Sequence, residues 1–180
     1  MGLSSSPDMK TPAAIPEFNL RGVDGKHHSL SSLAGSSATV VVFIGNGCPT
    51  VRAYEERLVA LQQTWGSRGV QVIAINANNS FLSPPDTFDE MVKRASDRRF
   101  NFHYLKDNNG AVAQGFAAVC TPHAFVLDCK LKVAYSGRID DSRVGNKITS
   151  RDLENAVADV VASRPVTVAR TDPFGCSIVW

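Results

Sequence analysis

Cysteine is scarce in this sequence, and the scarcity excludes two kinds of small protein. Four cysteines among 180 residues are too few for a disulfide-stapled scaffold. They are Cys48, Cys120, Cys129 and Cys176, and they lack the close pairing of a structural zinc site. No cluster of His, Cys and carboxylate residues has metal-ligand spacing, and no glycine-rich segment has that of a phosphate loop. The sequence therefore predicts no metal and no organic cofactor.

Long apolar runs and basic runs are also missing. The longest apolar run, residues 40–44, has strand length, whereas a bilayer-crossing helix needs about 20 residues. The net charge is +2 and no run of Lys or Arg forms a basic stripe, which argues against nucleic acid as a partner. The first 16 residues show no apolar signal-peptide core, so we expect a cytoplasmic protein, with an exported form whose signal was removed as the alternative.

The length and composition fit one globular domain with tails. An apolar share of 43% and a charged share of 20% are ordinary for such a domain. We expect a flexible segment over residues 1–16, a single domain over 17–163, and a C-terminal tail over 164–180 packed on that domain. No repeat or linker indicates a second domain.

Hydrophobic patterning predicts an α/β fold. A continuous apolar run over 39–44 predicts a buried strand, a 3.6-residue pattern from Val51 to Trp65 predicts a helix, and the run 70–77 predicts a second buried strand. Strand, helix and strand in this order predict a parallel pair joined by a right-handed crossover. The other expected elements are a hairpin over 18–33, a strand over 102–105, a short helix over 110–118, a hairpin over 123–136 and a closing helix.

Capping residues predict where two helices begin. Ser83, followed by two prolines and Asp86, predicts the N-cap of a helix running to about Arg99. Thr149 and Asp152 predict a capping box at the start of the closing helix.

Cys48 lies where the first buried strand gives way to a helix. Pro49 suits the first helical position, which places Cys48 at or near the helix N-cap. Free backbone N–H groups and the positive end of the helix dipole stabilise a thiolate there, and such placement lowers a cysteine pKa from about 8.5 to roughly 3.5–7.5. Cys48 is therefore a candidate nucleophile, and the alternative is an inert buried cysteine.

A second segment of interest is Cys120-Thr121-Pro122, just before a predicted strand. Pro122 could follow a cis peptide bond and bring this segment up to the Cys48 loop, or it could simply enter an edge strand. His123 could orient a substrate thiol or donate a proton, and the alternative is a strand residue facing solvent or bonded to the backbone.

These segments together resemble the thioredoxin-like superfamily. The match is to the peroxiredoxin-like thioredoxin family, which is related to the alkyl hydroperoxide reductase/thiol-specific antioxidant branch. Three motifs carry the resemblance: residues 48–51, residues 120–122 and the tail 173–180, which ends in Trp180. The resemblance implies a thioredoxin fold, a central mixed sheet flanked by helices with an N-terminal hairpin and a C-terminal tail. It also implies that Cys48 is the nucleophile.

The sequence departs from the motifs of both thioredoxins and peroxiredoxins. Val51 stands where thioredoxins have the second cysteine of Cys-x-x-Cys. Val41 and Gly45 stand where peroxiredoxins have Pro and Thr, and Pro122 aligns with the peroxiredoxin Arg. Any resolving cysteine must therefore lie elsewhere, and efficient peroxidase activity is disfavoured.

The resemblance also ranks the resolving candidates. Cys120 is favoured, because the segment before a cis-proline borders the nucleophile in this fold. Cys176 comes second, because the aromatic residues of its tail could carry it to the site. Cys129, in a hairpin turn, is expected to be a bystander.

The leading hypothesis is a thiol–disulfide oxidoreductase with Cys48 as nucleophile and Cys120 as resolving cysteine. Pro49, Thr121 and Pro122 would form the substrate platform, and an external thiol would supply electrons. The runner-up is a peroxiredoxin-like antioxidant peroxidase acting on peroxide. The third reading is a redox-inactive binding module that reuses the fold. The sequence predicts neither the physiological substrate nor the oligomeric state.

Overall fold

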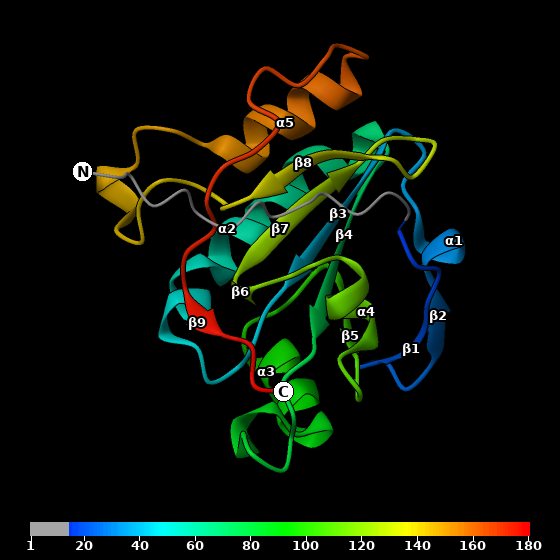
Figure 1. Cartoon of the computed structure of the whole chain (residues 1–180), viewed down its shortest axis with the longest axis vertical. Helices are drawn as coiled ribbons and strands as arrows, with labels where there is room; N and C mark the ends of the chain where they lie inside the picture. The colour runs from blue at the N-terminus through cyan, green and yellow to red at the C-terminus, as the bar shows by residue number, and fades with distance from the viewer. Residues whose placement is uncertain (1–14) are drawn as a thin grey trace, which may run out of the picture.

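A central mixed sheet organises the protein in this computed structural model (Figure 1). The structure describes residues 15–180, so most of the predicted flexible segment 1–16 lies outside it. Seven strands form the sheet in the order β2-β1-β5-β4-β3-β7-β8. Their bounds are β1 Asn19–Gly22, β2 His27–Ser29, β3 Ala38–Phe43, β4 Val70–Asn76, β5 His103–Lys106, β7 His123–Leu127 and β8 Val133–Gly137.

The predicted βαβ unit forms the centre of the sheet. β3 pairs in parallel with β4, and β4 pairs in parallel with β5. β7 runs antiparallel to β3 on the other side, which makes the sheet mixed. The central strands β3 and β7 are buried along their whole length, as expected of continuous β-branched and aromatic runs covered on both faces.

Helices cover both faces of the sheet and enclose two apolar cores. α2 (Pro49–Trp65), α3 (Phe88–Asp97) and α5 (Asp152–Val161) pack on one face, and α1 (Leu30–Leu33) and α4 (Ala111–Gly115) cover the other. Single-turn 3-10 helices are η1 (Gly66–Arg68), η2 (Pro84–Asp86) and η3 (Gly145–Lys147). Among the described residues, none of the helices could cross a bilayer.

A buried ion pair fixes α3 against α2. The side chain of Glu55, in α2, is almost fully buried and accepts from Arg94 Nε at 2.6 Å and from Arg94 Nη2 at 2.8 Å. Such a bidentate pair restrains both distance and angle between the two elements. The N-terminal half of α2, which directly follows Cys48, is thereby attached to α3.

Three local predictions are corrected by the structure. The predicted hairpin 18–33 ends at Ser29, because a Ser29–Ser32 capping box starts α1 instead. Ser83 does not cap α3: residues 84–86 form the separate 3-10 helix η2, and Thr87 is the N-cap. Thr149 forms no capping box for α5, because its side chain and backbone N–H bind Asp141.

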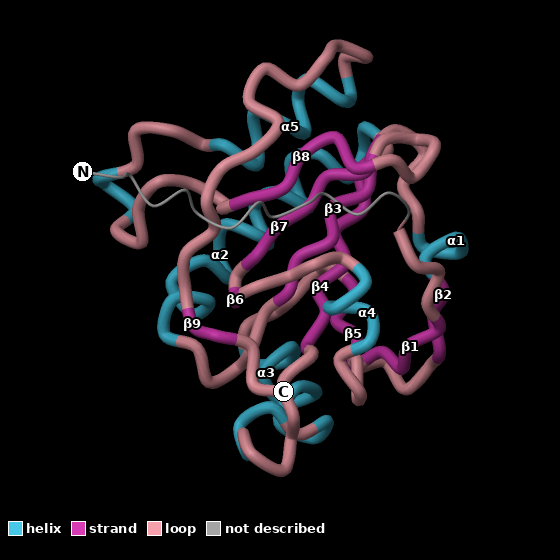
Figure 2. Tube along the Cα trace, viewed as in Figure 1, coloured by secondary structure: helices cyan, strands magenta, loops and turns pink. Residues whose placement is uncertain are grey.

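A second, two-stranded sheet stands at the end of the main one. β6 (Cys120–Thr121) pairs antiparallel with β9 (Cys176–Ser177), so the C-terminal tail lies against the segment before Pro122. In Figure 2, β6 is labelled at the lower end of β7, and β9 is the magenta segment of the tail near it. Further up the tail, Ser136 in β8 donates to Ala169 O and accepts from Thr171 N. The tail is therefore attached to the domain at several points.

Candidate active site

Cys48 is the N-cap of α2, as the sequence predicts. Its sulfur accepts from the Val51 N–H at 3.5 Å, and Pro49 occupies the first turn. The Cys48 residue is 4% exposed, whereas Gly47 and Pro49 on either side are exposed. A buried sulfur flanked by exposed residues sits just beneath the surface, at the end of a helix that favours negative charge.

Cys176 covers this sulfur. The Sγ atoms of Cys48 and Cys176 are 2.8 Å apart, although the two residues are 128 positions apart in the chain. Cys176 is only partly buried, so the pair is open to solvent on the tail side. The two sulfurs are within hydrogen-bond reach, and a bond between them needs little movement of either sulfur.

The proton of the pair belongs on Cys176. Burial opposes ionisation of Cys48, but hydrogen bonds from Cys176, from the Val51 amide and from Thr121 outweigh it and lower the pKa of Cys48. Burial, together with the hydrogen bond to Cys48 and its charge, raises the pKa of Cys176. The Thr121 carbonyl, 3.2 Å from Cys48 Sγ, accepts only from the protonated thiol and works against this balance without reversing it. When the pair holds a single proton, that proton therefore lies on Cys176, and Cys48 is the thiol that ionises first.

The segment before Pro122 forms one wall of the site. The Thr121–Pro122 bond is cis, the first of the two alternatives from the sequence. Thr121 pairs with Cys176 across the small sheet, and a Cβ at Gly175 would collide with the Thr121 carbonyl. The close approach of the two backbones requires glycine at 175. The backbone edge of Thr121 is therefore occupied by the protein's own tail.

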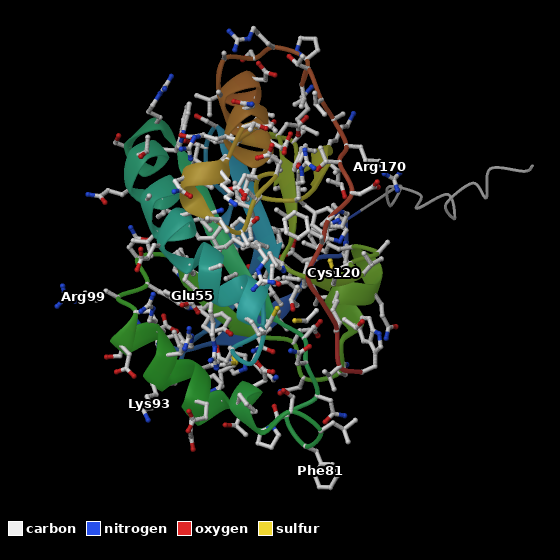
Figure 3. All side chains as sticks on the ribbon, turned by 90° about the vertical axis from the view of Figure 1, so that its left-hand side faces the viewer. Glu55, Phe81, Lys93, Arg99, Cys120 and Arg170 are labelled. Atoms are coloured by element: carbon white, nitrogen blue, oxygen red, sulfur yellow. The ribbon has the colours of Figure 1, made fainter. Side chains whose placement is uncertain are left out.

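Cys120 is near the pair, but its thiol contacts a backbone carbonyl instead of either sulfur. Its thiol lies 3.7 Å from the Pro122 carbonyl, and the residue is 8% exposed. Burial, followed by the charges of Cys48 and Cys176, raises the pKa of Cys120 to about 11. Figure 3 shows Cys120 beside the C-terminal tail, opposite the strand that carries Cys176. The geometry thus favours Cys176, the second candidate from the sequence, over Cys120 as the partner of Cys48.

His123 and Cys129, the other two residues discussed from the sequence, are not part of the sulfur pair. His123 is buried, accepts from the Val119 N–H at Nδ1, hydrogen-bonds Ser136 through Nε2 and stacks on Phe125. Burial, with a smaller effect of the nearby Arg170, lowers the pKa of His123 to about 4. A neutral histidine with both nitrogens engaged fits the backbone-bonded alternative better than a proton donor. Cys129 is exposed in the β7–β8 turn, as expected.

Sequence reasoning missed a buried polar cluster beside the Cys48 loop. Asp86 is fully buried, and its carboxylate accepts from the backbone N–H of Asn46 at 2.6 Å and from the side chain of Asn78 at 2.9 Å. Lys106, also buried, donates to the backbone carbonyls of Asp86 and Asn78. One signal was available: Asp86 and Lys106 are charged residues beside apolar segments. The capping interpretation of residues 83–86 used Asp86 for another purpose.

Gly45 shows why this cluster matters to the comparison with peroxiredoxins. A Cβ at Gly45 would meet the Asn78 amide at a distance that no real contact allows. A threonine, which peroxiredoxins carry here, would displace the Asn78 amide from its contact with Asp86. Val41, at the proline position, is a fully buried core residue. Among the described residues no group of three or more potential metal ligands is gathered.

Comparison with protein families identifies the family to which this chain belongs. Residues 12–136 match the model of the AhpC/TSA family, which is more than half of the chain. The chain belongs to the AhpC/TSA family. No protein of the curated set matches it. The resemblance read from the sequence is thereby confirmed.

Solved structures agree on the fold. An uncharacterised conserved protein from Geobacillus kaustophilus is 34% identical with a TM-score of 0.90, over 100% of this chain and 98% of that one. A hypothetical protein from Sinorhizobium meliloti 1021 is 31% identical with a TM-score of 0.88, over 95% and 94%. A thiol:disulfide interchange protein of the thioredoxin family from Chlorobium tepidum TLS is 22% identical with a TM-score of 0.66, over 84% and 98%. The α/β thioredoxin-like fold predicted from the sequence is confirmed.

Family and site together define the class of chemistry. The AhpC/TSA match and the thioredoxin-like fold make this chain a thiol-based redox enzyme, a thiol–disulfide oxidoreductase or a thiol peroxidase. The N-capping cysteine with a lowered pKa is the candidate for the nucleophile that either reaction requires.

Proposed function

We propose that this protein is a thiol–disulfide oxidoreductase in which Cys48 attacks the substrate and Cys176 resolves the intermediate. The observation that carries the proposal is the 2.8 Å contact between a nucleophile at a helix N-cap and a second cysteine on the tail. The pair replaces the local Cys-x-x-Cys centre that Val51 interrupts.

The reaction proceeds by two thiol exchanges. The Cys48 thiolate attacks one sulfur of a substrate disulfide, forms a mixed disulfide and releases the other sulfur as a thiolate. Cys176 then attacks Cys48 Sγ, forms the Cys48–Cys176 bridge and releases the second substrate thiol. Two electrons and the protons of the enzyme's dithiol have then passed to the substrate, and two equivalents of an external thiol restore the enzyme.

The electrostatics of the pair assist the second exchange. In the resting site the charge on Cys48 holds the pKa of Cys176 up, after the larger effect of burial. Once Cys48 is in a mixed disulfide, that charge is gone and the pKa of Cys176 falls. The resolving thiolate therefore forms when it is needed, and its proton neutralises the departing thiolate.

Family membership favours one second candidate, a thiol peroxidase. Cys48 would attack a peroxide oxygen and become a sulfenic acid while an alcohol or water leaves. Cys176 would then form the same bridge and release water. The absent Thr hydroxyl at Gly45 and the Pro122 that stands in place of the Arg remove two groups that would polarise the peroxide. We therefore place disulfide exchange first.

Matched cysteine variants test the roles. After a brief pulse of an oxidised monothiol, peptide mass mapping should find a Cys48–Cys176 bridge in the wild type, in Cys120→Ala and in Cys129→Ala. Cys176→Ala should accumulate a mixed disulfide at Cys48, and Cys48→Ser should lose turnover of a model disulfide. A bridge that forms only when Cys120 is present would make Cys120 the resolving cysteine, as favoured from the sequence. Rapid peroxide consumption without disulfide turnover would select the peroxidase.

A further inference from the structure

A buried carboxylate lies between the two segments that carry the reactive cysteines. Asp86 has no exposed surface. Its Oδ1 accepts from the Asn46 N–H at 2.6 Å and from Asn76 Nδ2 at 2.8 Å, and its Oδ2 accepts from Asn78 Nδ2 at 2.9 Å and from Ser83 Oγ at 2.6 Å. A buried carboxylate with this many donors is ionised and fixes the orientation of each of them.

The hydrogen bond between Asp86 and Asn46 connects the carboxylate to the loop that carries Cys48. Asn46 lies two residues before Cys48, and its backbone N–H is held by Asp86 while its side-chain oxygen accepts from Tyr104 OH at 2.9 Å. The Cys48 N–H in turn donates to Gly45 O at 3.3 Å, which closes the turn into α2. The carboxylate thus sets the path of the backbone that delivers the sulfur to the helix N-cap.

The hydrogen bond between Asp86 and Asn78 connects the carboxylate to the C-terminal tail. Asn78 receives the N–H of Val179 on its Oδ1 at 2.9 Å, and the backbone N–H of Asn79 donates to Val179 O at 2.6 Å. Val179 lies three residues after Cys176. The tail is therefore fixed on one side of Cys176 by β8 and on the other by this loop, with the β6–β9 pairing between them.

The charge of Asp86 dictates which way Asn78 faces. A carboxylate only accepts, so Asn78 must direct its NH₂ group at Asp86 and is left with its oxygen facing Val179. The four hydrogen-bond donors lower the pKa of Asp86 against the opposing effect of burial. The buried Lys106 ammonium, which donates to the Asn78 carbonyl at 2.6 Å, supplies the opposite charge nearby.

We propose that Asp86 and Asn78 are positioning residues that hold the Cys48 loop and the Cys176 tail in register, so that the two sulfurs meet. The inference deepens the proposed function and rests on it in taking Cys48 and Cys176 as the redox pair. The competing account is that the cluster merely stabilises the fold. That account predicts a lower melting temperature with unchanged behaviour of the tail in the folded protein.

A matched pair of tail variants separates the two accounts. Val179→Pro removes the backbone N–H that donates to the Asn78 side chain. Val179→Ala also removes the valine side chain but keeps that N–H. We expect Val179→Pro and Asn78→Ala to slow closure of the Cys48–Cys176 bridge about tenfold relative to Val179→Ala, the order set by one hydrogen bond. In the reduced proteins, alkylation of Cys176 should rise by a similar factor. Asn101→Ala, the same change at an exposed site, should match the wild type.

The charge of Asp86 is tested by Asp86→Asn. It should show the tail behaviour of Asn78→Ala and also move the alkylation pH profile of Cys48 upward, because a single neutral amide oxygen replaces the two charged oxygens that hold Asn78 and the Asn46 loop. If Asp86→Asn does not fold, Asn78→Ala and the Val179 pair still decide. Bridge closure and Cys176 alkylation equal to those of Val179→Ala would overturn the proposal.

A failure of the proposed function would look different. In that case the wild type itself forms no Cys48–Cys176 bridge. Hydrogen exchange at the Val179 amide and alkylation of Cys176 need no bridge, so they still report whether Asn78 holds the tail. Faster exchange at tail amides in Asn78→Ala than in Asn101→Ala supports the positioning role in either case, and equal rates contradict it.

Discussion

The position of one proton determines the reactivity of the site at the scale of single residues. Cys48 and Cys176 are close enough to share it, and their surroundings push their pKa values in opposite directions. A third thiol, the buried Cys120, faces a carbonyl and lies close to both. Three chemically identical side chains in one small region therefore have different pKa values and different reactivities. Functional sites commonly shift the pKa values of neighbouring groups in this way.

The first prediction concerns the pH dependence of alkylation. Because only the thiolate reacts, the labelling rate of Cys48 should rise through an inflection below that of an ordinary thiol. Cys176 should inflect above that value, and Cys120 at about 11. Peptide-resolved mass spectrometry of the fully reduced protein measures all of these, with a model cysteine peptide as reference. An inflection of Cys48 at or above that of the peptide would contradict the proposed ionisation.

The sequence was informative about Cys48 and less so about its partner. A strand, a glycine and a proline fix the setting of Cys48 locally, so its N-cap position could be predicted from neighbouring residues. The approach of Cys176 depends on a tail 128 positions away, and no local pattern encodes that distance. Asp86 was misread for a similar reason: its partners come from three separate segments.

At the scale of elements, the pairing of β6 with β9 is the distinctive feature. Only two residues on each strand take part, so most of the attachment of the tail comes from its flanks. One flank is the Phe174 ring, whose centroid is 6.3 Å from that of Tyr54 in α2. The other includes Ile178, which is buried in the core beneath α1 and α4. A short strand between two apolar anchors can open locally without unfolding the domain.

Replacing Gly175 with alanine should open this pairing. The added Cβ collides with the Thr121 carbonyl, and overpacking of this kind costs about 1–3 kcal/mol. The docked state of β9 should fall accordingly, by about fivefold to a hundredfold. Labelling of Cys48 by a bulky maleimide should then accelerate. Ser177→Ala, at an exposed position of the same strand, is the control, and equal rates in the two variants would show that β9 does not cover Cys48.

Elements with a strong periodic signal were predicted well, and their boundaries less so. β3, α2 and β4 fall within a residue or two of the patterns that predict them, because burial on both faces or on one helix face leaves a clear signature. Caps were harder, since Ser83 and Thr149 have the right chemistry but bind other groups. β6 and β9 escaped prediction, because two-residue strands exist only through their tertiary contact.

At the scale of the whole molecule, oxidation of the pair would close a very large loop. Cys48 and Cys176 enclose most of the domain, and a bridge between them restricts the unfolded chain far more than the folded one. Since the two sulfurs already touch in the folded protein, little distortion offsets this effect. The redox state of the site and the stability of the domain are therefore linked.

Oxidised protein should melt at a higher temperature than reduced protein. A loop of this size adds at most on the order of 4–5 kcal/mol, which corresponds to an increase in Tm of at most roughly 10–20 °C for a domain of this length. Calorimetry or circular dichroism of the two forms measures the difference. The Cys176→Ala variant should show the same Tm with and without oxidant. An oxidised wild type that melts at or below the reduced form would mean that the bridge strains the fold.

The pairing of β9 with the Thr121 edge has a consequence for selectivity. Because the tail is tethered, it competes for that edge at an effective concentration that a short connection puts in the millimolar range. A polypeptide substrate that binds as an extended strand has to outcompete it, whereas a small disulfide can approach through the solvent-exposed side of the sulfur pair. The protein thus carries its own competitive ligand, and its apparent affinity for large substrates depends on how firmly its last residues are held.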